Sequence, residues 1–89
     1  HVHLKNIREK ELKQSIADGD SFLQSIREGA FTVPGDKAGI IDFKPILTAL
    51  AKADYEGWLV VEAEQDPNKA NPLQYALMAR NYLRKTTGL

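Results

Sequence analysis

The sequence lacks several features that would point to particular protein classes. It has no cysteine among its 89 residues, so neither disulfides nor a thiolate metal site can hold the fold together. Its 12 Lys and Arg balance its 12 Asp and Glu, which removes the electrostatic case for nucleic acid or an anionic membrane as partner. No apolar run approaches transmembrane length. The first residues also lack the basic segment followed by an apolar segment that indicates a signal peptide. These absences favour an ordinary globular protein of the reducing cytoplasm.

One stretch organises what is present. The residues 58–61 are all apolar, and carboxylates and a turn-forming Asp-Pro pair follow them directly. This pattern is typical of a strand in a parallel sheet covered on both faces, and α/β folds carry their functional groups at the carboxyl ends of such strands. Strand alternation places four side chains on one face: Trp58, Val60, Glu62 and Glu64. Two carboxylates are therefore expected together where a buried strand meets solvent, the plain alternative being solvated charges at a strand end.

The first residues also alternate as a strand does. His1, His3 and Lys5 share one face, and Val2 and Leu4 share the other. A His-x-His strand is a metal signal of moderate specificity, because both imidazoles point the same way. A tag or surface histidine is the alternative interpretation. Because this strand already contains the first residue, we expect the chain to be a piece of a longer protein.

Between and after these strands the spacing of apolar residues predicts helices. A first helix, with Ile7, Leu12 and Ile16 on one side, is stopped by the turn residues 18–20. Ser21 opens a short second helix that contains Phe22 and ends near Gly29, and a pliable, glycine-containing loop is expected over 31–39. Further helices are expected after the caps Asp42 and Asn71.

This order of elements predicts an α/β fold. Strands that alternate with helices form a parallel sheet joined by right-handed crossovers. Two such strands do not make a domain, because their outer edges and their apolar inward face would be exposed. We therefore expect further strands outside this sequence, or association between copies as a homo-oligomer through the exposed strands near Trp58.

Five segments of the chain resemble a known family. The segments 1–5, 33–36, 41–43, 55–62 and 64–67 resemble the C-terminal end of a xylose-isomerase-like TIM barrel. The resemblance implies an α/β fold built from the last two β/α units of a (β/α)8 barrel. Residues 1–30 would then hold strand 7 and the following helices, 31–56 a substrate-side loop and helix, and 57–89 strand 8 and the terminal helix. The residues 62–67 and 71–76 are most similar to the dehydratases of inositol catabolism in that superfamily.

The resemblance implies a metal site and a substrate. In that superfamily two upstream carboxylates, a histidine of strand 7 and a glutamate of strand 8 bind one divalent ion, and the last two places match His3 and Glu62. Manganese or cobalt would suit this mixed donor set. Lys5 and Glu64 lie one alternation step further out, and we expect them to contact the substrate or carry protons. The substrate would be a small cyclic polyol ketone, and glutathione is implied as a cofactor by the resemblance only.

Two residues depart from the pattern of the superfamily. Many relatives have aspartate where this chain has Asn6, and the epimerases carry an arginine shortly after the metal histidine, whereas Arg8 is out of register. The second departure disfavours an epimerase and leaves the role of Arg8 open.

Three functions follow as hypotheses. The first is a metal-dependent lyase that dehydrates a keto-inositol, with the longer parent as the active enzyme and the 89-residue piece inactive alone. The second is a sugar isomerase or epimerase on the same barrel, which turnover of a ketohexose would reveal. The third is an inert, self-associating piece. A metal titration addresses the third, because two ligands alone bind an ion weakly.

Overall fold

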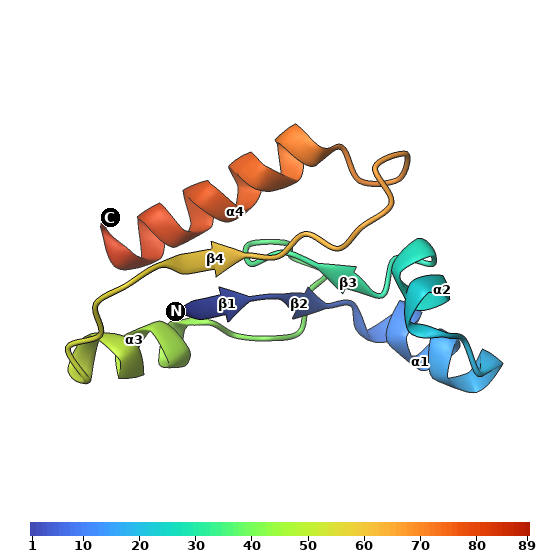
Figure 1. The fold of residues 1–89 in the computed structure, drawn as a ribbon, viewed down its shortest axis with the longest axis horizontal. Helices are drawn as coiled ribbons and strands as arrows, with labels where there is room; N and C mark the ends of the chain where they lie inside the picture. Colours follow the sequence, from blue (N-terminus) through green and yellow to red (C-terminus); the bar gives the residue numbers. More distant parts are fainter.

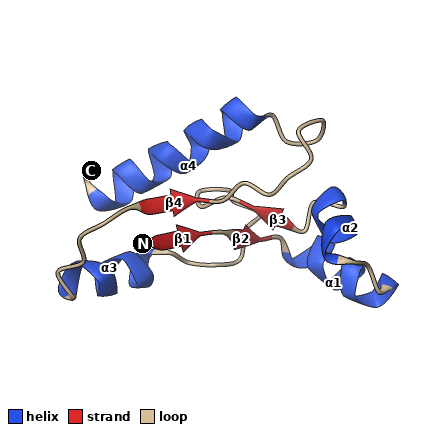
Figure 2. Cartoon of the chain, viewed as in Figure 1, coloured by secondary structure: helices blue, strands red, loops and turns tan.

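The computed structural model describes residues 1–89 and consists of short strands flanked by helices (Figures 1 and 2). In chain order the elements are β1 (Val2–Leu4), β2 (Asn6–Ile7), α1 (Glu9–Asp18), α2 (Phe22–Arg27), β3 (Phe31–Thr32), α3 (Lys44–Lys52), β4 (Leu59–Val61) and α4 (Pro72–Thr87). The predicted α/β order is confirmed, with β2 and β3 as additions. None of the helices combines the length and the apolar character that crossing a membrane requires.

The two predicted strands, β1 and β4, pair in parallel at the centre of the molecule. Val2 lies opposite Leu59, His3 opposite Val60, and Leu4 opposite Val61. In Figure 1 α4 is drawn above this pair and α3 below it. Both strands therefore end at the same edge of the sheet, as the sequence predicted.

A second ladder, antiparallel and very short, extends the first strand. Asn6 pairs with Thr32 and Ile7 with Phe31, and an isolated bridge joins Arg8 to Gly39. The prediction that Ile7 begins the first helix and that 31–32 are loop is therefore wrong. Strands of two residues are too short for alternation to appear in the sequence.

The hydrophobic core lies on the helix-covered face of the parallel pair. Its buried members are Leu4, Phe43, Leu47 and Leu83, and the partly buried residues around them include Val2, Leu59 and Val61. Burying a side chain of this size contributes about 1.5–3 kcal/mol. The opposite face is largely bare, and Trp58 there is 71% exposed. The faces expected from alternation are the ones observed.

Helix starts agree with the sequence at two of three predicted caps. The side chains of Ser21 and Asn71 accept hydrogen bonds from the N–H groups of Gln24 and Gln74. Asp42 does not cap α3 as expected: the helix begins at Lys44, whose N–H donates to the Asp42 carboxylate. This contact closes a local turn just ahead of the helix.

The first helix departs from its predicted apolar stripe. Ile16 is exposed, and the polar Ser15 is buried in its place. The helix is rotated relative to the prediction because the chain ahead of it is extended through Ile7. The apolar pattern included a residue that belongs to a strand, and the inferred face was wrong in consequence.

The glycines of the loop that follows β3 permit close packing. Gly35 has φ +95°, and a Cβ there would lie 2.7 Å from the Cβ of Tyr82 on α4. A Cβ on Gly39 would overlap the side chain of Asn6. The buried Asn6 in turn accepts hydrogen bonds from the N–H groups of Ile7 and Ile41. The loop is thus packed against both β2 and α4.

Candidate functional site

The carboxyl ends of β1 and β4 bring a histidine and a carboxylate together. The Nδ1 atom of His3 lies 2.6 Å from Oε1 of Glu62 in a side-chain hydrogen bond. The parallel ladder continues one step beyond β4, since the N–H of Glu62 donates to the carbonyl of Leu4 at 2.9 Å. The sequence predicted that His3 and Glu62 would approach each other here, and they do.

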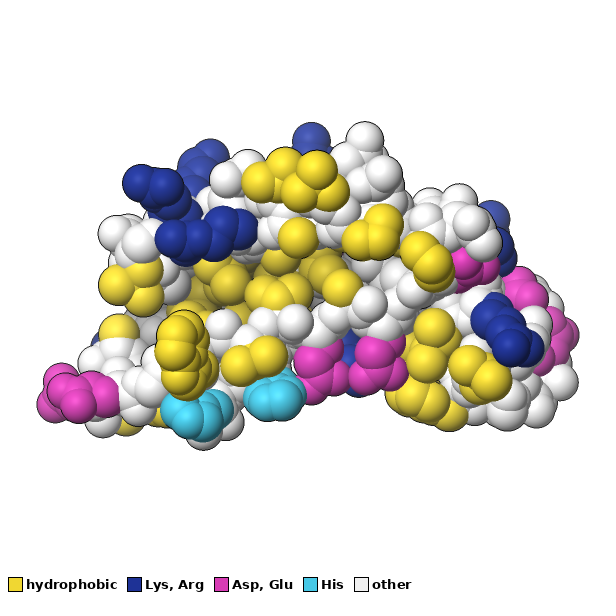
Figure 3. All heavy atoms as spheres, turned by 45° about the horizontal axis from the view of Figure 1, so that its top comes forward, with side chains coloured by type: hydrophobic (Ala, Val, Ile, Leu, Met, Phe, Trp, Pro, Cys, Tyr) yellow, Lys and Arg dark blue, Asp and Glu magenta, His cyan; other side chains and the backbone are white.

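Lys5 and Glu64 extend this contact outward. The Nζ atom of Lys5 lies 3.0 Å from Oε2 of Glu62 and 2.6 Å from Oε1 of Glu64. The four side chains His3, Glu62, Lys5 and Glu64 therefore form one continuous series of contacts, which we call the ionic row. Figure 3 shows histidine and acidic side chains side by side along one edge of the molecule, next to apolar ones. All four predicted site residues are thus brought together.

The contacts fix the charges within the ionic row. Hydrogen bonds from Lys5, and then from His3, lower the pKa of Glu62 to about 2. Hydrogen bonds to Glu64 and then to Glu62 raise the pKa of Lys5 above its ordinary value. At neutral pH Glu62 is therefore an anion with lone pairs to donate, and Lys5 is an ammonium with protons to donate.

Two aromatic rings lie beside the ammonium of Lys5. Its Nζ atom is 5.3 Å from the centre of the Phe31 ring and 5.8 Å from that of Phe22. The two ring centres are 5.3 Å apart with the planes tilted by 49°. The sequence placed Phe22 among the apolar residues of a helix and Phe31 in a loop, so it missed both. Their proximity to Lys5 depends on β2 and β3 pairing, which the sequence did not reveal.

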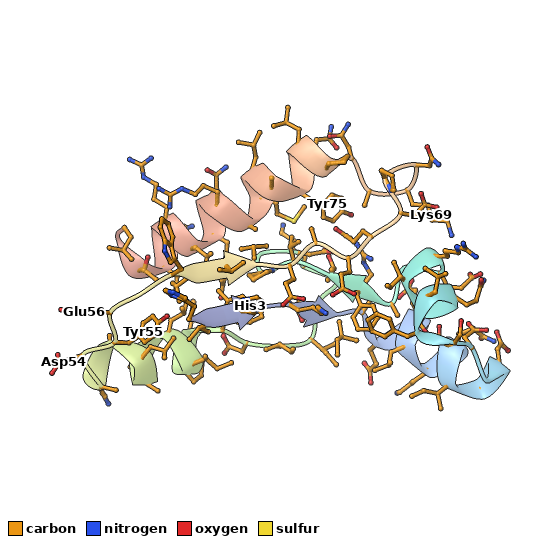
Figure 4. All side chains as sticks on the ribbon, viewed as in Figure 1. His3, Asp54, Tyr55, Glu56, Lys69 and Tyr75 are labelled. Carbon is orange, nitrogen blue, oxygen red and sulfur yellow. The ribbon has the colours of Figure 1, made fainter.

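Arg8 ties together segments that are far apart in the chain. Its side chain is only 15% exposed. The guanidinium donates to five groups at 2.8–3.2 Å: the carbonyls of Gly29 and Phe31, the side chains of Thr32 and Asp36, and the hydroxyl of Tyr75. Figure 4 labels Tyr75 near the start of α4. Arg8 therefore holds the segment 29–36, which carries Phe31, against α4.

Asp36 completes this network. Burial alone would raise the pKa of Asp36, but hydrogen bonds from Thr32 and Ala38 together with the nearby Arg8 charge outweigh it and lower the pKa. The Thr32 hydroxyl donates to Oδ2 at 2.6 Å and the Ala38 N–H to Oδ1 at 2.9 Å. No sequence signal marks these partners, because Arg8, Asp36 and Tyr75 share no spacing rule.

Two atoms of the ionic row have the chemistry of metal ligands. A ring nitrogen and a carboxylate oxygen suit first-row divalent ions, and ligands of one such ion lie roughly 3 Å apart, which the His3–Glu62 pair nearly matches. No group of three or more histidine, cysteine or acidic side chains that could hold a metal occurs in residues 1–89. The pair fits part of a metal site, and its role as a metal ligand set remains a prediction.

Comparison with known proteins gives one consistent result. No family model matches the chain. Curated proteins named inosose dehydratase match all 89 residues, with 57% identity in Geobacillus thermodenitrificans (strain NG80-2), 57% in Clostridium perfringens (strain 13 / Type A) and 53% in Klebsiella pneumoniae (strain 342). The chain spans 29% of the length of these relatives. The resemblance to keto-inositol dehydratases is thereby confirmed.

Proposed function

We propose that this chain is the C-terminal part of an inosose dehydratase, which removes water from a keto-inositol, and that it supplies the last two β/α units of a TIM barrel. The observation that carries the proposal is the identity of 53–57% to proteins of that name over all 89 residues. The parallel β1–β4 pair and the functional groups at its carboxyl end agree with a barrel of this kind.

His3 and Glu62 would hold a divalent metal ion such as manganese or cobalt. The lone pairs that now share one proton at 2.6 Å are those that a cation would take. The remaining ligands would come from parts of the parent outside these residues. When bound, such an ion polarises the ketone of the substrate and favours loss of the neighbouring proton.

Lys5 and Glu64 divide the proton transfers of a dehydration. Glu64 accepts the proton from the carbon next to the ketone, and Lys5, held as an ammonium, donates a proton to the departing hydroxyl, which leaves as water. Glu64 is then protonated and Lys5 neutral. Transfer across their 2.6 Å contact restores both charges, so that one turnover releases one water with no net proton change.

The resemblance implies glutathione as a cofactor, although the proton transfers above need no thiol. The structure has cavities of about 1000 and 510 Å³, which lie along α4, and neither is lined by a member of the ionic row.

Turnover by the longer parent protein tests the proposal. Incubation with a keto-inositol and manganese should yield the dehydrated diketone, which is detected by its ultraviolet absorbance. Incubation with a ketohexose should give no isomerised product. Replacement of Glu64 by Gln should lower the turnover of the keto-inositol. The matched control is Glu9→Gln, which removes a carboxylate paired with Lys13 on α1, and it should leave turnover unchanged. Interconversion of ketohexoses without dehydration would contradict the proposal and favour an isomerase or epimerase.

A further inference from the structure

We infer that Phe22 and Phe31 form an aromatic wall of the substrate site, which takes a C–H face of the cyclic substrate and selects ring-shaped over open-chain polyols. The inference rests on the proposed function and extends it to residues outside the ionic row. The aromatic wall consists of these two rings, which meet at 5.3 Å between centres.

The position of the aromatic wall supports this role. Both rings lie within 5.8 Å of the Lys5 ammonium, the atom that contacts Glu62 and Glu64. A substrate that reaches Lys5 therefore also reaches the rings. Binding sites commonly combine aromatic walls with a few placed polar groups.

The ring of Phe22 is accessible within residues 1–89. Phe22 is 59% exposed and lies at the start of the six-residue helix α2, which the Ser21 cap holds in place. Arg8 holds the backbone that carries the Phe31 ring, because its guanidinium donates to the backbone carbonyl of Phe31 at 3.1 Å. The Ser21 cap and the Arg8 contact thus anchor the aromatic wall at its base, and the Phe22 ring is uncovered within residues 1–89.

The chemistry of a cyclic polyol fits such a surface. The oxygens of an inositol-like ring project mainly from its rim, where Lys5 and the two glutamates can bind them. Its faces carry C–H groups with a slight positive charge, which the negative face of an aromatic ring attracts. An open-chain polyol of equal size presents no flat C–H face, so the aromatic wall discriminates by shape.

A ring that only stabilised Lys5 would behave differently from one that contacts the substrate. Loss of a cation–π contact would alter the proton donor and hence kcat and its pH profile. Loss of a substrate-facing wall would weaken binding and raise KM with kcat little changed. The two roles therefore separate in a single kinetic experiment.

The experiment compares Phe22→Ala with Phe22→Tyr in the longer parent protein. We expect Phe22→Ala to raise the KM for the keto-inositol and the inhibition constant of myo-inositol by about fivefold, since an aromatic contact is worth about 1 kcal/mol. The inhibition constant of an open-chain hexitol should not change, and Phe22→Tyr should restore the parent values. Leu23→Ala, on the same helix and 54% exposed, is the matched control and should leave KM unchanged.

Two results would overturn the inference. One is an unchanged KM in Phe22→Ala, and the other is a lower kcat with a shifted pH profile at constant KM. Binding of myo-inositol measured by calorimetry separates this inference from the proposed function. If the parent binds myo-inositol through Phe22 but releases no dehydrated product, the proposed function fails and the aromatic wall stands.

Discussion

His3 Nδ1 lies 2.6 Å from Glu62 Oε1, although the two residues are 59 positions apart in the chain. The parallel register of β1 and β4 produces this contact, because it sets His3 opposite Val60 and places Glu62 one step beyond Val61. Two donor atoms of different chemistry are thus positioned by backbone pairing alone.

Removal of either donor atom should empty the proposed metal site of the parent protein. We expect His3→Ala and Glu62→Ala each to lower metal content and to reduce dehydration by at least about a hundredfold, because changes even to the outer shell of metal sites cost 10–100-fold. Elemental analysis of the purified variants measures the first effect, and turnover of the keto-inositol measures the second.

Glu64→Gln serves as the matched control for metal content. Its carboxylate contacts Lys5 but lies outside the His3–Glu62 pair, so metal content should stay at the parent level while turnover falls. A metal-free Glu64→Gln would show that the roles of the two glutamates are the reverse of those proposed.

Replacement of Arg8 by lysine should destabilise the fold despite the conserved charge. A single ammonium cannot reach the five acceptors that the planar guanidinium serves, so we expect a loss of about 2–3 kcal/mol in the free energy of unfolding. Tyr75→Phe removes one hydrogen bond of the set and should cost about 1 kcal/mol. Urea denaturation of the parent protein measures both. Arg80→Lys, on the exposed side of α4, is the control, and an equal loss there would contradict the role of Arg8.

Acid should weaken the same network through Asp36. The pKa of this carboxyl is lower in the folded protein than its ordinary value of 3.8, so the folded state binds protons less readily than the unfolded state. Its contribution is therefore complete above pH of about 4 and is lost as the pH falls through the lowered pKa. Urea denaturation from pH 7 down to pH 2 should show the parent losing its advantage over Asp36→Asn. A stability difference that is constant with pH would contradict this assignment.

The 89-residue chain by itself should associate. β4 pairs on one side only, and the 71% exposed Trp58 directly precedes this strand, where an unpaired edge and an apolar surface favour contact between copies. Analytical ultracentrifugation should detect species larger than a monomer, and Trp58→Glu should reduce them. Leu73→Glu changes a residue of similar exposure on α4 and should have little effect. A cooperative, folded monomer of the unmodified chain would defeat this prediction.

The sequence was sufficient to predict the parallel pair and the ionic row. Alternation assigned His3, Lys5, Glu62 and Glu64 to one face, and parallel pairing then required that they meet. Alternation acts over neighbouring residues, and the order of strands and helices implies parallel pairing, so both can be inferred without a structure.

The sequence was insufficient where contacts depend on chain segments that no periodicity relates. The five acceptors of Arg8 come from two loops, a short strand and the start of α4, so its role became visible only in three dimensions. Phe22 likewise carried the pattern of a core residue, but its helix lies at the margin of the molecule and its ring is exposed.

The register of β1 and β4 also has a kinetic consequence. Each of its residue pairs joins positions separated by 57 in sequence, since 59 minus 2, 60 minus 3 and 61 minus 4 are all 57. Such pairing forms only after a long loop closes, which makes it slow compared with helix formation. During synthesis the helices α1 and α2 can form while Glu62 is still untranslated, so the ionic row is among the last features of this segment to be assembled.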